Sequence, residues 1–149
     1  MLQRRTLYAL KALLELAQAQ ETLCSVSHIA QRQKIPAAML EQILLQLRRA
    51  GLVVARRGRS GGYGLARPAN SIYLEQVANA VGERLQQAEP SLSHDDKHED
   101  NATDQVLAML ERRLRRSLTK ALRETTLEEL FLDLRSWQAI LEDDNALML

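Results

Sequence analysis

Three features of this sequence predict a mainly α-helical fold built around a helix-turn-helix unit and a short β-hairpin. The 149 residues include only one Phe, one Trp and three Tyr, so a core must be built largely from Leu, Ala, Val and Ile. Hydrophobic residues recur every three and four positions, which is the spacing of amphipathic helices. An arginine- and glycine-rich turn at residues 56–62 separates two short β-prone runs. Together these features predict a winged helix-turn-helix, with three helices, a two-stranded wing and a long C-terminal helix.

The helix expected at residues 36–50 is the centre of this prediction. Pro36 suits the first helical position, and Gly51 suits the left-handed residue that follows a last turn. One face is aliphatic and predicts a core contact; its members are Leu40, Ile43, Leu44 and Leu47. The other face of the first turns is small and polar, formed by Ala37, Ala38, Glu41 and Gln42. Such a face fits a DNA groove and can hydrogen-bond base edges, and Arg48 near the end of the helix adds a positive charge.

A basic hairpin is expected directly after this helix. Residues 52–55 form the first β-prone run, and residues 63–65 return. Glycine lets the turn bend sharply, and the planar arginine fork pairs with phosphate. The turn residues expected to contact DNA are Arg56, Arg57, Gly58, Arg59, Ser60 and Gly61.

Two helices are expected before the reading helix. The first spans residues 3–18, and its expected buried stripe is Leu7, Leu10, Leu13, Leu14 and Ala17. Arg4 and Arg5 at its start are either phosphate contacts or solvated terminal charges. The second helix spans residues 26–33, with Ser25 as its N-cap. The short connection to Pro36 completes a helix-turn-helix.

The second half of the chain predicts further helices and an acidic loop. A short helix around residues 74–81 is followed by a polar, acidic run that predicts a flexible loop at residues 86–104. A long helix at 106–123 carries leucines spaced by three and four, and a last helix begins at Thr125 or Thr126 within a capping box. The expected buried face of the last helix is Leu127, Leu130, Phe131, Leu134, Trp137 and Leu141. The predicted organisation is a winged domain at 1–85, the loop at 86–104 and a helical region at 105–149.

Charge is segregated along the chain and indicates a polyanionic partner for the first half. Residues 1–70 hold 11 Lys and Arg against 3 Asp and Glu, whereas residues 71–149 hold 9 against 16. No run of apolar residues is long enough to cross a membrane, and Cys24 alone cannot form an intramolecular disulfide, so we expect a cytoplasmic location. No nucleophile–base arrangement, P-loop or dinucleotide motif is present, so an enzyme is not expected.

Several motifs resemble the Rrf-two type (IscR/NsrR/CymR-like) family of bacterial winged-helix transcription regulators. The most specific are Leu40-Glu41-Gln42 in the reading helix and Arg57-Gly58-x-x-Gly61-Gly62-Tyr63 in the wing. The resemblance covers nearly the whole chain. It implies a homodimer on a dyad-symmetric operator, with reading helices in successive major grooves and wings beside them. It also implies that the long helix forms the dimer seam, through Leu107, Leu110, Leu114, Leu118 and Ala121.

One departure from the family pattern bears on its signal. Cluster-bearing relatives place three cysteines between the short helix and the dimer helix, and this chain has none in residues 83–106. We therefore expect a regulator, a repressor, without an iron–sulfur cluster and without a cofactor or a bound metal.

Two alternatives follow from other residues. The winged helix can serve as an adaptor for a protein partner, with the arginine run of the long helix as one docking surface. A metal or redox sensor would use His94 and His98, which are four residues apart in an acidic run, or Cys24.

Overall fold

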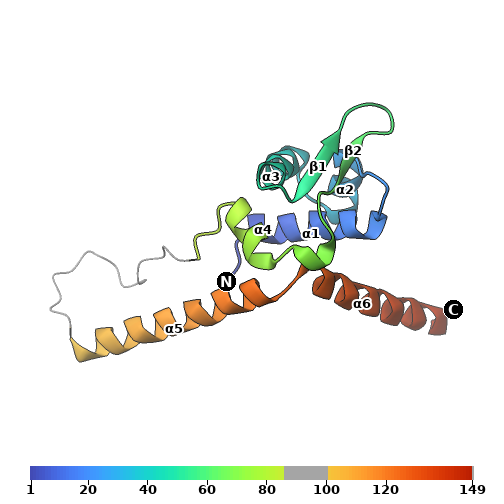
Figure 1. Cartoon of the computed structure of the whole chain (residues 1–149). Helices are drawn as coiled ribbons and strands as arrows, with labels where there is room; N and C mark the ends of the chain where they lie inside the picture. The colour runs from blue at the N-terminus through green and yellow to red at the C-terminus, as the bar shows by residue number, and fades with distance from the viewer. Residues whose placement is uncertain (86–100, 149) are drawn as a thin grey trace.

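The computed structural model describes residues 1–85 and 101–148. Within these ranges the chain forms six α-helices and one hairpin, as the sequence predicted, and one 3₁₀ turn that was not predicted (Figure 1). The elements are α1 (Arg4–Ala19), α2 (Val26–Gln33), α3 (Ala37–Arg49), β1 (Val53–Arg56), β2 (Gly62–Leu65), η1 (Ala69–Ser71), α4 (Leu74–Ala80), α5 (Ala102–Glu124) and α6 (Leu127–Leu147).

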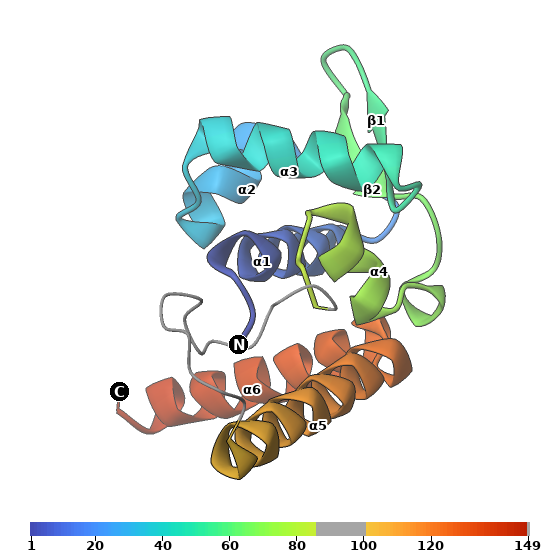
Figure 2. The same ribbon diagram turned by 90° about the vertical axis from the view of Figure 1, so that its left-hand side faces the viewer.

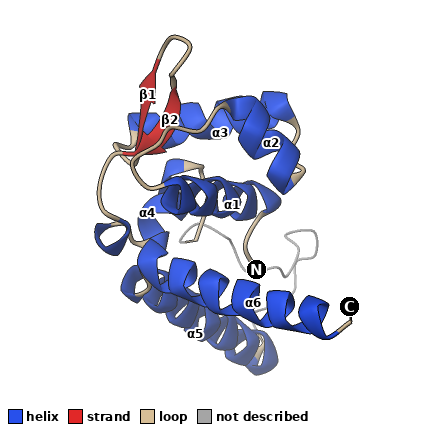
Figure 3. Ribbon diagram, turned by 90° about the vertical axis from the view of Figure 1, so that its right-hand side faces the viewer, coloured by secondary structure: helices blue, strands red, loops and turns tan. Residues whose placement is uncertain are grey.

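These elements lie in three tiers. Figure 2 shows α2, α3 and the hairpin on one side, α1 and α4 in the middle, and α5 and α6 on the other side. Figure 3 shows the same order from the opposite side. The DNA-reading elements predicted from the sequence therefore lie on the side of the molecule away from α5 and α6.

The helix-turn-helix forms as predicted. The Ser25 hydroxyl caps α2 by accepting the His28 N–H at 3.1 Å, and Lys34 adopts a left-handed φ of 53° that ends the helix. The aliphatic face of α3 is fully buried and consists of Leu40, Ile43, Leu44 and Leu47. Pro36 was predicted as the first helical residue, but its ψ of 127° is not helical, so it is the N-cap and α3 begins one residue later, at Ala37.

Helix α1 forms the centre of the core, but one residue predicted to be buried in it is exposed. Leu7 is 46% exposed, so its assignment to the buried stripe was wrong. Leu10, Leu13 and Ala17 are buried as predicted, together with Ala9 and Leu16. Small residues on this face let neighbouring helices approach closely, and a leucine one turn from the N-terminus lies at the edge of that contact.

Helix α5 begins earlier than predicted. Asn101 caps it by accepting the Asp104 N–H at 2.9 Å, so the helix starts at Ala102 and includes the last three residues assigned to the loop. The rest of that predicted loop, with His94 and His98, lies outside the described residues. The division into domains stays a prediction.

The junction between α5 and α6 belongs to the common core. The Leu74 N–H donates to the Thr125 carbonyl at 3.0 Å, and the Leu127 N–H donates to the Ile72 carbonyl at 2.8 Å. Thr126 caps α6, as predicted, by accepting the Glu129 N–H. The two helices are thus held at one point against the segment before α4.

Beyond this junction, α6 leads away from the body of the molecule (Figure 1). In the single chain only Leu127 of the predicted face is buried, whereas Trp137 is 63% exposed and Leu141 is exposed as well. The prediction that this whole stripe is buried was therefore wrong for one chain. Helix α6 contacts α1 and η1. Along the described residues, no helix is apolar over enough length to cross a bilayer.

Candidate nucleic-acid interface

The first turns of α3 present the small and polar face that the sequence predicted. Their side chains are exposed, and the exposed set comprises Ala37, Ala38, Glu41 and Gln42. The buried leucines on the opposite face fix the rotation of the helix, so this face must point outward. Arg48, in the last turn of α3, is exposed too.

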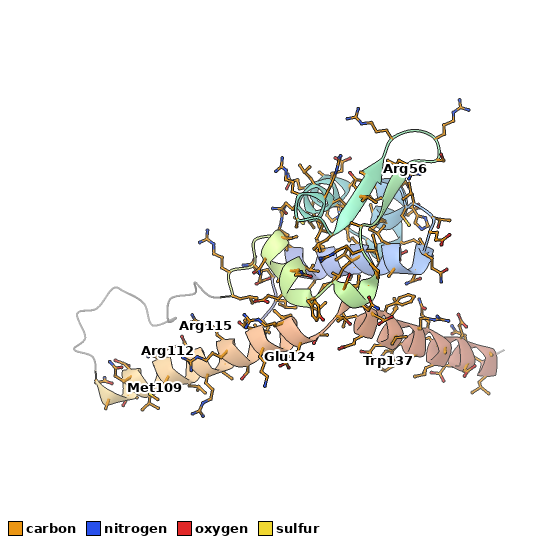
Figure 4. All side chains as sticks on the ribbon, viewed as in Figure 1. Arg56, Met109, Arg112, Arg115, Glu124 and Trp137 are labelled. Carbon is orange, nitrogen blue, oxygen red and sulfur yellow. The ribbon has the colours of Figure 1, made fainter. Side chains whose placement is uncertain are left out.

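The wing is a regular antiparallel hairpin beside α3. Val53 pairs with Leu65 at its base and Arg56 pairs with Gly62 at its end. All of the turn residues from Arg56 to Ser60 are exposed, and Gly61 is half-buried. Figure 4 shows Arg56 on this hairpin, at the top of the molecule. Within the described residues none of the three wing arginines forms an ion pair, so their charges face solvent.

Two glycines hold the wing against the connection between α1 and α2. Cys24 and Tyr63 exchange backbone hydrogen bonds of 2.8 and 2.7 Å. A Cβ on Gly62, which has a φ of +144°, would lie 2.6 Å from the Cys24 carbonyl oxygen. A Cβ on Gly61 would lie 2.2 Å from the Arg56 carbonyl oxygen, so the tight turn also needs glycine there. The wing is therefore anchored at its return strand, and its tip projects.

The two arginines at the start of α1 have different surroundings. Arg4 is exposed, whereas the Arg5 guanidinium donates to the Gln46 side-chain oxygen of α3 at 2.7 and 3.0 Å. Arg5 thus ties α1 to α3, a role that spacing alone did not reveal. Their phosphate contacts stay predictions.

A carboxylate also braces the start of α1. The Glu83 side chain accepts the Gln3 N–H at 3.0 Å and the Thr6 hydroxyl. A negative charge at a helix N-terminus is favoured by the helix dipole. Helix α1, which supports α3 from below, is therefore fixed at its first turn.

Cys24 lacks the features of a reactive thiol. Burial raises its pKa above the ordinary 9.0, and the negative charge of Glu15 raises it further. Glu15 is itself buried and accepts hydrogen bonds from Arg32 at 3.2 Å and from Gln33. This buried carboxylate was not anticipated, although a glutamate within an apolar stripe of α1 was a visible signal.

The five residues predicted for a dimer seam lie on the outer tier. Leu107, Leu110 and Leu114 are 43%, 48% and 60% exposed, and Ala121 is exposed as well. Leu118 is half-buried and packs against the core. Within one chain, most of this stripe therefore contacts solvent.

A family model named Rrf2, described as an iron-dependent transcriptional regulator, matches residues 2–133 of the chain. The chain belongs to the Rrf2 family. The protein slr0846 of Synechocystis, whose name describes an HTH-type transcriptional regulator, is 44% identical over 133 residues, covering 89% of this chain and 88% of that protein. The regulator IscR of Cereibacter sphaeroides is 48% identical over 81 residues, but the match covers only 52% of each protein.

Solved structures show the same architecture. CymR, the global cysteine regulator of B. subtilis, matches with a TM-score of 0.70 and 29% identity over 88% of this chain and 95% of CymR. T. potens IscR matches with a TM-score of 0.70 and 28% identity over 93% of this chain and 90% of IscR. The predicted family and fold are thus confirmed. The protein is a DNA-binding transcriptional regulator, not an enzyme.

The iron in the family description does not fit the donors of this chain as a cysteine-ligated cluster. The sequence contains a single cysteine, and the Cys24 thiol is buried beside the carboxylate of Glu15. A cluster needs several thiolate ligands. One buried thiol with a raised pKa supplies neither their number nor their charge.

Proposed function

We propose that this Rrf2 regulator is a homodimeric repressor that binds a dyad-symmetric operator without a cysteine-ligated iron–sulfur cluster. The observation that carries the proposal is the pairing of two exposed elements. The polar first turns of α3 lie beside a hairpin whose three arginines have no ion-pair partner among the described residues. One face of the molecule thus combines a helix surface that fits a DNA groove with positive charges that can pair with phosphate.

Each exposed residue has a role in this proposal. Glu41 accepts from cytosine N4, and Gln42 pairs with adenine N6 and N7 in the major groove. The small Ala37 and Ala38 let the helix approach the bases. The wing arginines contact the flanking backbone or minor groove, where a planar guanidinium binds well.

The second protomer covers α5. Three leucines there are at least 43% exposed and lie on one stripe, which is a pattern that association of two helices would bury. In one chain α3 lies on the side away from α5 (Figure 1). Two protomers joined through α5 would therefore leave both copies of α3 accessible to DNA. Dimers of this kind read half-sites that are about one helical turn apart.

The test is enrichment of genomic DNA fragments by the purified protein, after its visible spectrum is recorded in air. We expect a colourless protein that enriches one dyad-symmetric site, and an Arg57→Ala protein that enriches it far less. A brown protein would contradict the proposed absence of a cluster. A colourless protein that enriches no site would contradict sequence-specific DNA binding.

The adaptor alternative differs in its dependence on salt. A DNA complex that uses several arginines per protomer loses affinity steeply as salt rises, because counterions are released on binding. A sensor that uses Cys24 would need an accessible thiolate. The Cys24 side chain is buried, and its raised pKa disfavours the thiolate form. Unchanged operator affinity of a Cys24→Ser protein under oxidising and reducing conditions is the expected result.

A further inference from the structure

A second cluster of positive charge lies far from the DNA-reading face, along α5. The cluster lines a groove on the surface of α5. Its basic residues are Arg112, Arg115, Arg116, Lys120 and Arg123. These residues recur every three or four positions and so share one face of the helix. Figure 4 shows Arg112 and Arg115 along α5, below the tier that holds the reading helix. This cluster is not part of the DNA interface described above.

The groove has the dimensions and the lining of a ligand site. Its volume is about 480 Å³, which falls within the range of small-molecule sites. Leu85 forms an apolar wall, and the Thr119 side chain also lines it. A site with one apolar wall and several guanidinium groups suits a small molecule that carries phosphate or carboxylate groups.

The charges of the groove are incompletely neutralised. Arg115 pairs with Glu111 at 3.4 Å, and Arg123 pairs with Glu75 at 3.1 Å. Glu124 also lines the groove, and its carboxylate lies 4.0 Å from the Lys120 ammonium. Within the part of the chain that the structure describes, Arg112 and Arg116 form no ion pair, and Arg112 only donates to a carbonyl of its own helix at 3.3 Å. Like charges four residues apart destabilise a helix. A bound anion would relieve that repulsion.

The groove stays open in the proposed dimer. At about 100° per residue, Arg112 and Arg116 lie on the face of α5 roughly opposite Leu107 and Leu114. A second copy that covers the leucine stripe therefore leaves the arginines accessible. The groove and the proposed seam are two separate faces of one helix.

One end of the groove is connected to the DNA-reading domain. The Arg123 guanidinium donates to both Glu75 oxygens of α4, at 3.1 and 3.2 Å. Helix α4 in turn packs against α1 and α3. An anion that draws Arg123 away from Glu75 would change how α5 is held against the domain that carries α3.

We propose that this groove binds a small polyanion, bearing phosphate or carboxylate groups, and that its occupancy alters operator affinity. The regulatory part rests on the proposed function, whereas the binding part does not. Calorimetry of the full chain with sodium tripolyphosphate, at physiological ionic strength and without DNA, tests the binding part.

The variants separate this groove from general attraction of charge. Arg112→Gln with Arg116→Gln removes two lining guanidinium groups and should weaken binding by at least about tenfold, because two charge-assisted contacts are lost. Arg113→Gln removes one positive charge from an exposed position of the same helix that does not line the groove, and should leave binding within about twofold. Arg57→Ala should also leave tripolyphosphate binding unchanged. If tripolyphosphate bound at the wing rather than in the groove, its binding would weaken in this variant. Thermal melts confirm that each variant is folded.

Two results would overturn the proposal, namely no binding by the natural protein and equal weakening in the Arg113→Gln control. Operator binding by the same samples separates the two proposals. Intact operator binding with no bound tripolyphosphate refutes only the groove, and the reverse refutes only the proposed function.

Discussion

The two sides of this molecule differ in how much of their apolar surface a single chain buries. On the DNA-reading side, α3 buries all four residues of its aliphatic face and exposes small, polar and basic side chains. On the other side, α5 and α6 bury mainly Leu122 and Leu127 near their junction and leave large apolar residues exposed. The first side is complete within one chain. The second side exposes the apolar surface that the proposed second protomer would cover.

The exposed stripe of α5 gives the largest test of this difference. Replacing Leu110 and Leu114 by Asp should yield a monomer in sedimentation and weaken operator binding by about 100-fold or more, because linkage of two binding modules is lost. Arg113→Asp changes an exposed residue of the same helix outside the stripe and should leave the dimer intact. A double variant that remains dimeric would refute the proposed seam.

The tightly packed wing gives a test of the first side. Gly62→Ala places a Cβ 2.6 Å from the Cys24 carbonyl and should lower the free energy of unfolding by about 2–4 kcal/mol. Gly51→Ala is the matched control, because that glycine also has a positive φ, of 75°, but no atom within 4 Å of the added Cβ. Its cost should be about 1 kcal/mol. Equal costs by chemical denaturation would show that the close approach to Cys24 is unimportant.

The wing arginines should affect binding without affecting folding. Arg57→Ala is expected to cost about 1–3 kcal/mol of operator binding and to reduce the salt dependence. Its melting temperature should not change, since the side chain is exposed and forms no ion pair with the described residues. Unchanged affinity in the folded variant would remove Arg57 from the interface.

On the DNA-reading side, different residues should govern the preference for a base sequence and the general affinity for DNA. Gln42→Ala should change the preferred base at one position in each half-site, with a discrimination of about 1–3 kcal/mol lost. Arg4→Ala should weaken all DNA sequences alike and by less, because a phosphate contact carries no base information. Binding-site selection on randomised DNA measures both effects, and a uniform loss for Gln42→Ala would contradict base reading.

The link between the two sides gives the smallest effect. The Arg123 hydrogen bond lowers the pKa of Glu75 below its ordinary 4.5. Because the folded pKa is lowered, the contact stabilises the fold above that ordinary value and is lost as pH falls through the lowered one. Carboxyl titration by NMR should show the low value, and Arg123→Gln should raise it toward 4.5. A midpoint that does not move would mean that Arg123 does not govern this group.

The two sides also differed in how well the sequence predicted them. The outward face of α3 and the bend of the wing follow from local rules, namely helical spacing and runs of glycine, and the structure confirms both elements. Leu7 was misplaced because it lies three positions before Leu10, which is buried as predicted, so helical spacing alone does not separate the two. Trp137 of α6 was assigned to a buried face that a single chain does not bury.

Long-range contacts were beyond the reach of spacing altogether. Arg5 with Gln46, Glu83 with Thr6 and Glu75 with Arg123 join residues more than 40 positions apart. Nothing in the local sequence marks such pairs, because only the folded arrangement brings the elements together. The basic groove was visible in the sequence merely as an arginine run on a helix.

The central claim is that one chain reads half of a site and a second copy reads the other half. The most direct measurement is the stoichiometry and affinity of the protein on a dyad-symmetric operator and on the same DNA with one half-site scrambled. The account predicts two protomers on the intact operator and a loss of affinity of about 100-fold or more when either half is scrambled. One protomer bound with equal affinity to both DNAs would contradict it.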